Sequence, residues 1–145
     1  MKKSIFFALL LLVSILGNLQ ADSSNERIAP FDELILSGNI DVLLVKGDVE
    51  AVDIKSEAEK VSISVNSGVL KVKRKKPLKI KSYKQRPIQV VITYQVLRRV
   101  KAASGAEVTN RATLTGDQLV LDFNSGAHGD FVVDLGDLEI KVSEG

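Results

Sequence analysis

Apolar and polar residues alternate along most of the chain after residue 31. Alternation with a period of two predicts β-strands that bury one face. No segment of ten or more residues after residue 21 shows a convincing helical period. We therefore predict an all-β fold, with strands that include residues 40–44, 52–54, 61–65, 70–72, 88–94, 96–102, 119–123 and 138–142.

A short phrase recurs near the C-terminus and indicates how these strands are arranged. Residues 103–106 read Ala-Ser-Gly-Ala, residues 124–127 read Asn-Ser-Gly-Ala 21 positions later, and residues 143–145 read Ser-Glu-Gly a further 19 positions on. A fixed period near 20 predicts a β-solenoid, similar to a parallel β-helix, in which each coil adds short strands. Glycine suits the corner of each coil because it has no Cβ. We assign three glycines to structural turns: Gly38, Gly105 and Gly126.

A β-sandwich is the alternative architecture, because it also has short strands separated by frequent turns. The regular period favours the solenoid from residue 96 onward. Before that point the spacing is less regular, and we expect irregular hairpins that cap the first coil. The sequence stops at Gly145 within a repeat phrase. This position predicts either a domain truncated at its C-terminus or an open coil end that a partner covers.

The first 21 residues predict a secretory signal peptide. Lys2 and Lys3 form a basic start, a 12-residue apolar run extends from Ile5 to Leu16, and cleavage is expected after Ala21. The alternative is an uncleaved anchor, although a span of the bilayer needs about 20 apolar residues. We therefore predict export to the periplasm, the outer membrane surface or the extracellular space.

The remaining chain predicts a polar leader over residues 22–30 and one β domain over residues 31–145. The chain has no cysteine, so neither a disulfide nor a lipid-attachment cysteine is available. Stability must then come from strand pairing and core packing. Without Lys2 and Lys3, basic and acidic residues balance at 18 each, so the distribution of charge is more informative than its sum.

Two parts of the sequence resemble a known family. Residues 31–42 read Phe-x-x-Leu-x-Leu-Ser-Gly-Asn-Ile-x-Val, and residues 100–106 and 124–127 carry the Ser-Gly-Ala turns. This ordered set resembles the family described as putative auto-transporter adhesin, head GIN domain. The chain departs from it by placing Gly-Asn-Ile at residues 38–40 where the family has Gly-Ile-Asn. The resemblance implies an exported, solenoid-like envelope domain with a role in adhesion, and it transfers no catalytic residue.

The strongest chemical signal is a basic run. Residues 71–101 hold twelve basic residues and no acidic one, and nine of the cations lie within residues 71–86. Rows of cations attract polyanions by releasing counterions. The alternative is a solvated hairpin whose lysines discourage pairing between sheet edges. The candidate polyanion-binding residues are Lys71, Lys73, Arg74, Lys75, Lys76, Lys79, Lys81, Lys84 and Arg86.

For an exported protein, the expected polyanions are lipopolysaccharide phosphates, anionic lipid head groups and acidic glycans, and nucleic acid is disfavoured. A second hypothesis is a structural module that assembles into homo-oligomers through its open coil ends. Its basic segment would then dock on the acidic faces of neighbouring copies. Both hypotheses describe a protein that is not an enzyme.

Catalytic and metal chemistry have weaker support in the sequence. A hydrolase would combine Ser125 or Ser104 with His128 and a nearby aspartate, but the repeat already explains both serines. One histidine without cysteine cannot make the usual zinc site, and we predict no cofactor and no metal. Four carboxylates could approach each other on successive coils and bind calcium, but a solvated acidic face is the favoured explanation: Asp122, Asp130, Asp134 and Asp137.

Overall fold

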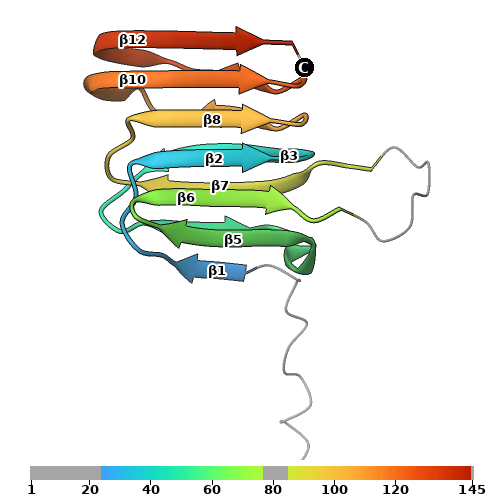
Figure 1. Ribbon diagram of the computed structural model, residues 1–145. Coiled ribbons are helices and arrows are strands. Elements are labelled where there is room, and N and C mark those ends of the chain that lie inside the picture. Colours follow the sequence, from blue (N-terminus) through green and yellow to red (C-terminus); the bar gives the residue numbers. More distant parts are fainter. Residues whose placement is uncertain (1–23, 77–84, 145) are drawn as a thin grey trace, which may run out of the picture.

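A computed structural model describes residues 24–76 and 85–144, which form two six-stranded sheets (Figure 1). Each sheet contains parallel and antiparallel pairs, and the all-β prediction is confirmed. Sheet A has the order β1 (Ser24–Arg27), β4 (Ala51–Ile54), β7 (Ile88–Tyr94), β3 (Ile40–Lys46), β9 (Glu107–Asn110) and β11 (His128–Asp130). Sheet B has the order β12 (Val133–Ser143), β10 (Leu114–Asn124), β8 (Arg99–Ala103), β2 (Glu33–Ser37), β6 (Val69–Arg74) and β5 (Val61–Asn66).

The only helical element in the described part of the chain is the short 3-10 helix η1 (Ala58–Lys60). Among these residues no helix has both the length and the apolar character needed to cross a membrane. The predicted signal peptide, residues 1–21, lies outside the described residues.

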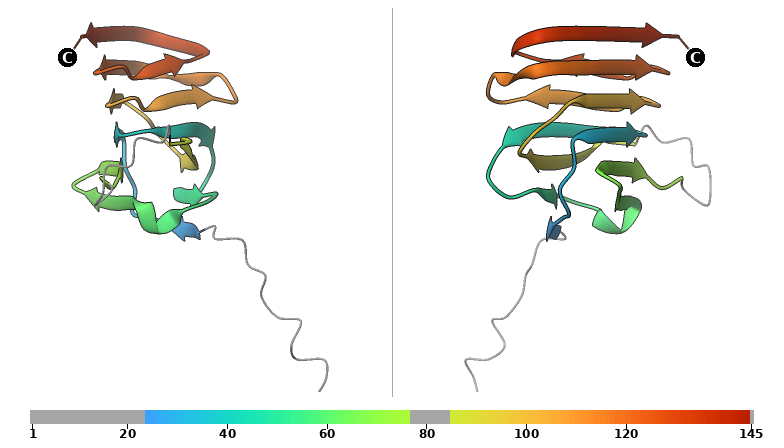
Figure 2. Two further views of the ribbon diagram at one scale, coloured as in Figure 1. Left: turned by 90° about the vertical axis from the view of Figure 1, so that its right-hand side faces the viewer. Right: turned by 60° about the vertical axis from the view of Figure 1, so that its left-hand side comes forward.

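The sequence repeat becomes strand register in the C-terminal half. From β8 onward the chain alternates between the sheets, and each strand of sheet B lies parallel to the one before it. Val100 of β8 lies opposite Leu121 of β10, and Leu121 lies opposite Ile140 of β12. Apolar residues that are 21 and then 19 positions apart in the sequence therefore lie side by side in sheet B. Figures 1 and 2 show these strands stacked toward the end of the molecule that carries β12.

The N-terminal half is stacked in an order that the sequence did not reveal. β2 lies between β6 and β8, and β3 lies between β7 and β9. The first pass of the chain through the two sheets, β2 and β3, therefore lies inside the stack and not at its end. The antiparallel pairs β1–β4 and β5–β6 lie at the far end. β5 therefore covers β6, and the pair β1–β4 covers β7, so β6 and β7 lie between these end strands and the first pass of the chain, β2 and β3. Residues 24–27 of the predicted leader form β1, which is an edge strand and can keep polar side chains in solvent.

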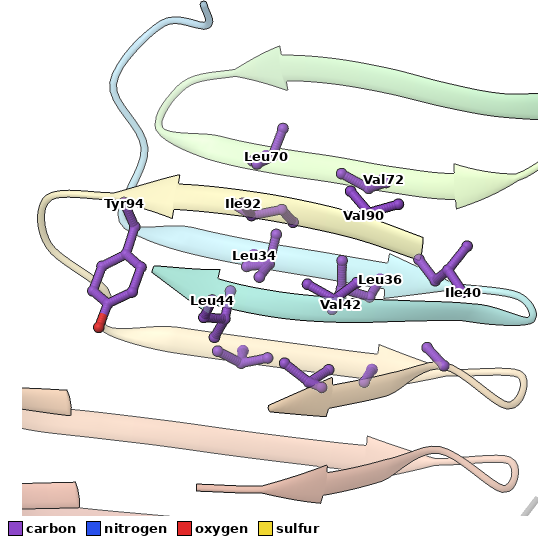
Figure 3. Packing of buried hydrophobic residues seen from close by; sticks show 14 of the residues in the cluster. Leu34, Leu36, Ile40, Val42, Leu44, Leu70, Val72, Val90, Ile92 and Tyr94 are labelled. Carbon is purple, nitrogen blue, oxygen red and sulfur yellow. The ribbon is translucent and has the colours of Figure 1, made fainter. Parts of the chain in front are cut away.

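The core lies between the two sheets and is built from the inward rows of the alternating strands. Leu34 and Leu36 of β2 and Val42 and Leu44 of β3 are at most 1% exposed, and their side chains point into this space (Figure 3). The intervening polar residues face outward, as the period of two requires. The rows continue through Leu121 and Phe123 to the β12 end, where burial decreases.

Candidate functional site

A cleft of about 890 Å³ opens between η1, the end of β6 and the start of β7. Five of its lining side chains are cationic and two are carboxylates, so the cleft carries an excess of positive charge. We call it the basic cleft. Its lining residues are Ser56, Glu57, Glu59, Lys60, Arg74, Lys75, Lys76, Gln85, Arg86, Pro87 and Gln89.

Arg74 holds one wall of the basic cleft together. Its Nη1 donates hydrogen bonds to the carbonyl oxygens of Asn39 and Arg86, at 2.9 Å each. Asn39 in turn donates from Nδ2 to the carbonyl of Gln85 at 2.7 Å. These bonds tie the entry to β7 to the turn between β2 and β3. Gly38 is part of the same contact, because a Cβ placed on it would lie 2.8 Å from Cβ of Arg74.

The opposite wall is built around η1. Lys75 donates from Nζ to the carbonyl of Glu59 at 2.8 Å, and its backbone N–H donates to the carbonyl of Lys60, also at 2.8 Å. Lys60 forms an exposed ion pair with Glu57. The hydrogen bond from Lys60 holds the pKa of the Glu57 carboxyl below its usual value. These contacts bring Lys60 and Lys75 to the same rim of the cleft.

The structure separates the predicted basic residues into groups. Lys71 and Lys73 lie exposed on the outer face of β6 and do not line the cleft. Lys75, Lys76 and Arg86 line the cleft and are exposed, whereas Arg74 is half-buried in its backbone hydrogen bonds. Arg74 is therefore better described as a positioning residue than as a free cation. The remaining candidates, Lys79, Lys81 and Lys84, lie outside the described residues.

Lys60 is a cleft residue that the sequence analysis did not identify. The antiparallel pairing of β5 and β6 places Val61 opposite Arg74, so the preceding residue, Lys60, meets Lys75. The available signal was the tight turn Asn66-Ser67-Gly68. Counting outward from that turn gives the register of the hairpin, and hence the neighbours of each lysine in the basic run.

The repeated turns have a structural explanation. Ser104, Gly105, Ser125 and Gly126 all have positive φ, between 51° and 78°. The turns also stack, since the N–H of Gly105 donates to the carbonyl of Ser125 at 3.2 Å. A Cβ on Gly105 or Gly126 would meet nothing within 4 Å, so the need for glycine there is conformational and not steric.

His128 follows the second of these turns. Its Nδ1 lies 2.9 Å from the carbonyl oxygen of Gly126, in its own turn. Ser125 occupies a turn position with a φ of 51°. Within residues 24–76 and 85–144, no three His, Cys, Asp or Glu side chains gather into a group that could hold a metal ion. We therefore take the basic cleft, with its excess of positive charge, as the candidate functional site.

A second, apolar hollow of about 580 Å³ lies at the β12 end. Phe123 and Phe131 meet there edge to face, with ring centroids 6.1 Å apart. Ile140 and Val142 of β12 line the same hollow. This surface differs from the basic cleft in both chemistry and position.

Solved structures with similar folds include proteins from Bacteroides and Parabacteroides species. A putative adhesin from Parabacteroides distasonis ATCC 8503 has a TM-score of 0.70 at 23% identity, covering 85% of this chain and 53% of that one. A putative adhesin from Bacteroides fragilis NCTC 9343 has a TM-score of 0.69 at 14% identity, covering 84% of this chain and 57% of that one. A putative lipid binding protein from Parabacteroides distasonis ATCC 8503 has a TM-score of 0.57 at 16% identity, covering 88% and 63%.

At these identities the similarity concerns the fold alone, and this chain spans little more than half the length of the two adhesin structures. No curated protein shows significant sequence similarity to it. The family model for the putative auto-transporter adhesin, head GIN domain, matches residues 30–145. Together with the apolar register and the Ser-Gly turns of β8 to β12, this match shows that the chain belongs to the head GIN domain family.

Proposed function

We propose that this chain is an exported, non-enzymatic adhesion module whose basic cleft binds anionic groups of the cell envelope. The observation that carries the proposal is the convergence of five cationic side chains on one cleft of about 890 Å³. Four of these five belong to the basic run that the sequence singled out, namely Arg74, Lys75, Lys76 and Arg86. The shared chemistry of the ligands is phosphate or carboxylate, as in lipopolysaccharide, lipid head groups and acidic glycans.

The proposed module is a β-solenoid in form. Support comes from the parallel ladders β2–β8–β10–β12 and β7–β3–β9–β11, which build both faces from successive passes of the chain. A stack of this kind presents flat surfaces on which binding groups can be arranged. In this proposal residues 1–21 direct export and are removed, residues 22–30 lead into the domain, and residues 31–145 form it. The location is the periplasm, the outer membrane surface or the extracellular space.

The cleft is tested by retention of the protein on lipopolysaccharide, anionic vesicles and an acidic glycan across a salt series. The cleft variant is Lys76→Gln/Arg86→Gln. The matched control is Lys71→Gln/Lys73→Gln, which removes the same charge from the outer face of β6. A third variant, Arg74→Gln, removes a residue whose guanidinium holds the wall in place.

We expect the cleft variant to bind more weakly and to lose salt dependence, by roughly one unit of log–log slope for each cation that contacts the polyanion. The outer-face control should retain its slope. The surface that retains the protein identifies which of the three anionic sources it binds. Equal losses in the two double variants would mean that net charge, and not the cleft, governs retention, and absence of retention on all three surfaces would refute the proposal.

A further inference from the structure

Two carboxylates, Glu57 and Glu59, line the basic cleft together with its five cations. An ionised carboxylate only accepts hydrogen bonds, so it repels a bound anion and binds groups that donate. A cleft that held only a bare phosphate or carboxylate would gain nothing from these two side chains. Their presence indicates a ligand that brings hydrogen-bond donors as well as a negative charge.

Glu59 is the carboxylate that such a ligand can reach most directly. It is exposed, and its side chain forms no ion pair with any residue in the described ranges. Its backbone carbonyl accepts a hydrogen bond from Nζ of Lys75 at 2.8 Å, which holds this residue at the cleft. Glu57 is paired with Lys60 through Oε1, which leaves Oε2 as a second acceptor. Both residues can therefore accept hydrogen bonds from a ligand.

Uncharged polar side chains complete the lining. Ser56, Gln85 and Gln89 all face the cleft and are exposed. A serine hydroxyl and a primary amide each donate and accept hydrogen bonds. The hydroxyl groups of a sugar have the same double capacity. The neutral part of the cleft therefore suits a polyhydroxylated ligand.

An ammonium group is the other donor that a carboxylate could bind, and the neighbouring lysines disfavour it. Lys60 is paired with Glu57, and Nζ of Lys75 lies at the backbone of Glu59. The charge of Arg74 also acts on the Glu57 carboxyl. These cations repel a further ammonium group, whereas a neutral hydroxyl group is not repelled. The charges around the two carboxylates thus favour hydroxyl donors.

The anionic part of the ligand has its own partners in the cleft. Lys76 and Arg86 are exposed, and neither forms an ion pair within residues 24–76 and 85–144. The backbone of Arg86 is held by Arg74, whose Nη1 donates to its carbonyl at 2.9 Å. A guanidinium can bind a carboxylate or a phosphate through two parallel hydrogen bonds. One wall of the cleft therefore offers Arg86 to an anion, and the opposite wall, around η1, offers carboxylates to donors.

We propose that the ligand of the basic cleft is a saccharide that carries a negatively charged group. Arg86 and Lys76 bind the anionic group, and Glu59 and Glu57 accept hydrogen bonds from hydroxyl groups of the sugar ring. This inference rests on the proposed function, because the same cleft is the binding site. The cleft volume of about 890 Å³ is within the range of pockets that enclose a small ligand. The shared chemistry covers sugar acids and sugar phosphates, and it leaves out lipid phosphates that bring no sugar.

Two probes of equal charge test the role of the hydroxyl groups. Glucuronate has a carboxylate and several hydroxyl groups on its ring, whereas cyclohexanecarboxylate has the carboxylate and no hydroxyl group. Titrations of the protein at fixed ionic strength, followed by NMR, give the dissociation constant of each probe. We expect the original chain to bind glucuronate about tenfold more tightly, which corresponds to two hydrogen bonds of typical net strength.

Variants assign the two parts of the ligand to the two sets of side chains. Glu59→Gln should reduce the preference for glucuronate by about threefold, since hydrogen bonds to a charged acceptor are the stronger ones. Glu107→Gln is the matched control, because it makes the same change at an exposed glutamate of β9 that does not line the cleft. It should keep the original preference. Lys76→Gln/Arg86→Gln should weaken both probes by the same factor. The ratio of the two constants is the readout, because a general loss of folded protein does not change it.

A second pair of probes identifies the anionic group. Glucose 6-phosphate should bind more tightly than inorganic phosphate, and its affinity relative to glucuronate shows whether the cleft prefers a sugar phosphate or a sugar acid. Phosphoethanolamine tests the ammonium alternative. If it bound more tightly than inorganic phosphate and lost this gain in Glu59→Gln, the carboxylates would belong to an ammonium site, and the saccharide proposal would be overturned.

The results separate this inference from the proposed function. Equal affinity of the original chain for glucuronate and cyclohexanecarboxylate, or equal weakening of both by Glu59→Gln, would overturn the saccharide proposal and leave the cleft as a site for anions. Unchanged affinity for both probes in Lys76→Gln/Arg86→Gln, or no binding of any probe by the original chain, would overturn the anion site and the saccharide proposal together.

Discussion

Replacing Gly38 by alanine should destabilise the fold more than the same change at Gly105. Both glycines have positive φ, 95° at Gly38 and 78° at Gly105. A Cβ on Gly105 would meet nothing within 4 Å, whereas a Cβ on Gly38 would lie 2.8 Å from Cβ of Arg74. The two substitutions therefore share a conformational cost, and only Gly38→Ala adds a steric one.

The magnitudes follow from these two contributions. Placing an L-residue in the left-handed region costs roughly 1–2 kcal/mol, which is the full expected effect of Gly105→Ala. Forcing an extra methyl group against packed atoms adds roughly 1–3 kcal/mol. We thus expect Gly38→Ala to lower the free energy of unfolding by about 2–5 kcal/mol. The contact atom is Cβ of Arg74, so shortening Arg74 to alanine leaves the clash in place and only Arg74→Gly removes it.

Urea unfolding of the single and double variants measures this coupling. In a double-mutant cycle, Gly38→Ala should couple favourably with Arg74→Gly, by about 1–2 kcal/mol, because the second change removes the clash created by the first. The cycle with Arg74→Ala should show much less coupling, since it retains Cβ. Equal destabilisation by Gly38→Ala and Gly105→Ala, or equal coupling in the two cycles, would refute the steric argument.

Two further predictions concern the core. Leu36→Ala removes a side chain that is 0% exposed and should lower the free energy of unfolding by about 2–5 kcal/mol. Ile35→Ala, on the outward face of the same strand, should lower it less. The urea midpoint at constant m-value measures both changes. Burial raises the pKa of the Tyr94 phenol above its ordinary value of 10.0, so its contribution to stability is present below pH 10 and is lost as pH rises through the raised pKa. The Tyr83→Phe variant leaves Tyr94 as the one tyrosine. In this variant the absorbance of the phenolate should appear above pH 10 in the folded protein and near pH 10 in urea. The same titration midpoint in both states would contradict the raised pKa.

The C-terminal half shows how far the sequence determines the fold. The repeat of 21 and 19 residues predicted which apolar residues share a row, and Val100, Leu121 and Ile140 do lie opposite one another. The repeat carries this information because a parallel stack adds the same length of chain at each level. Where the repeat is absent, as in β2 and β3, the period of two predicts strands but not their neighbours. A strand with one apolar face satisfies that face equally well at any level of the stack.

The sequence showed a basic run but not the cleft that some of its residues line. The sequence places Lys73, Arg74 and Lys75 in one run and gives them the same chemistry. In the structure, Arg74 hydrogen-bonds to the carbonyl of Asn39, 35 residues away in the chain, and to the carbonyl of Arg86 just before β7. Such contacts depend on the stacking order, which composition and charge do not reveal. Lys60, in contrast, was accessible to prediction through the register of the β5–β6 hairpin.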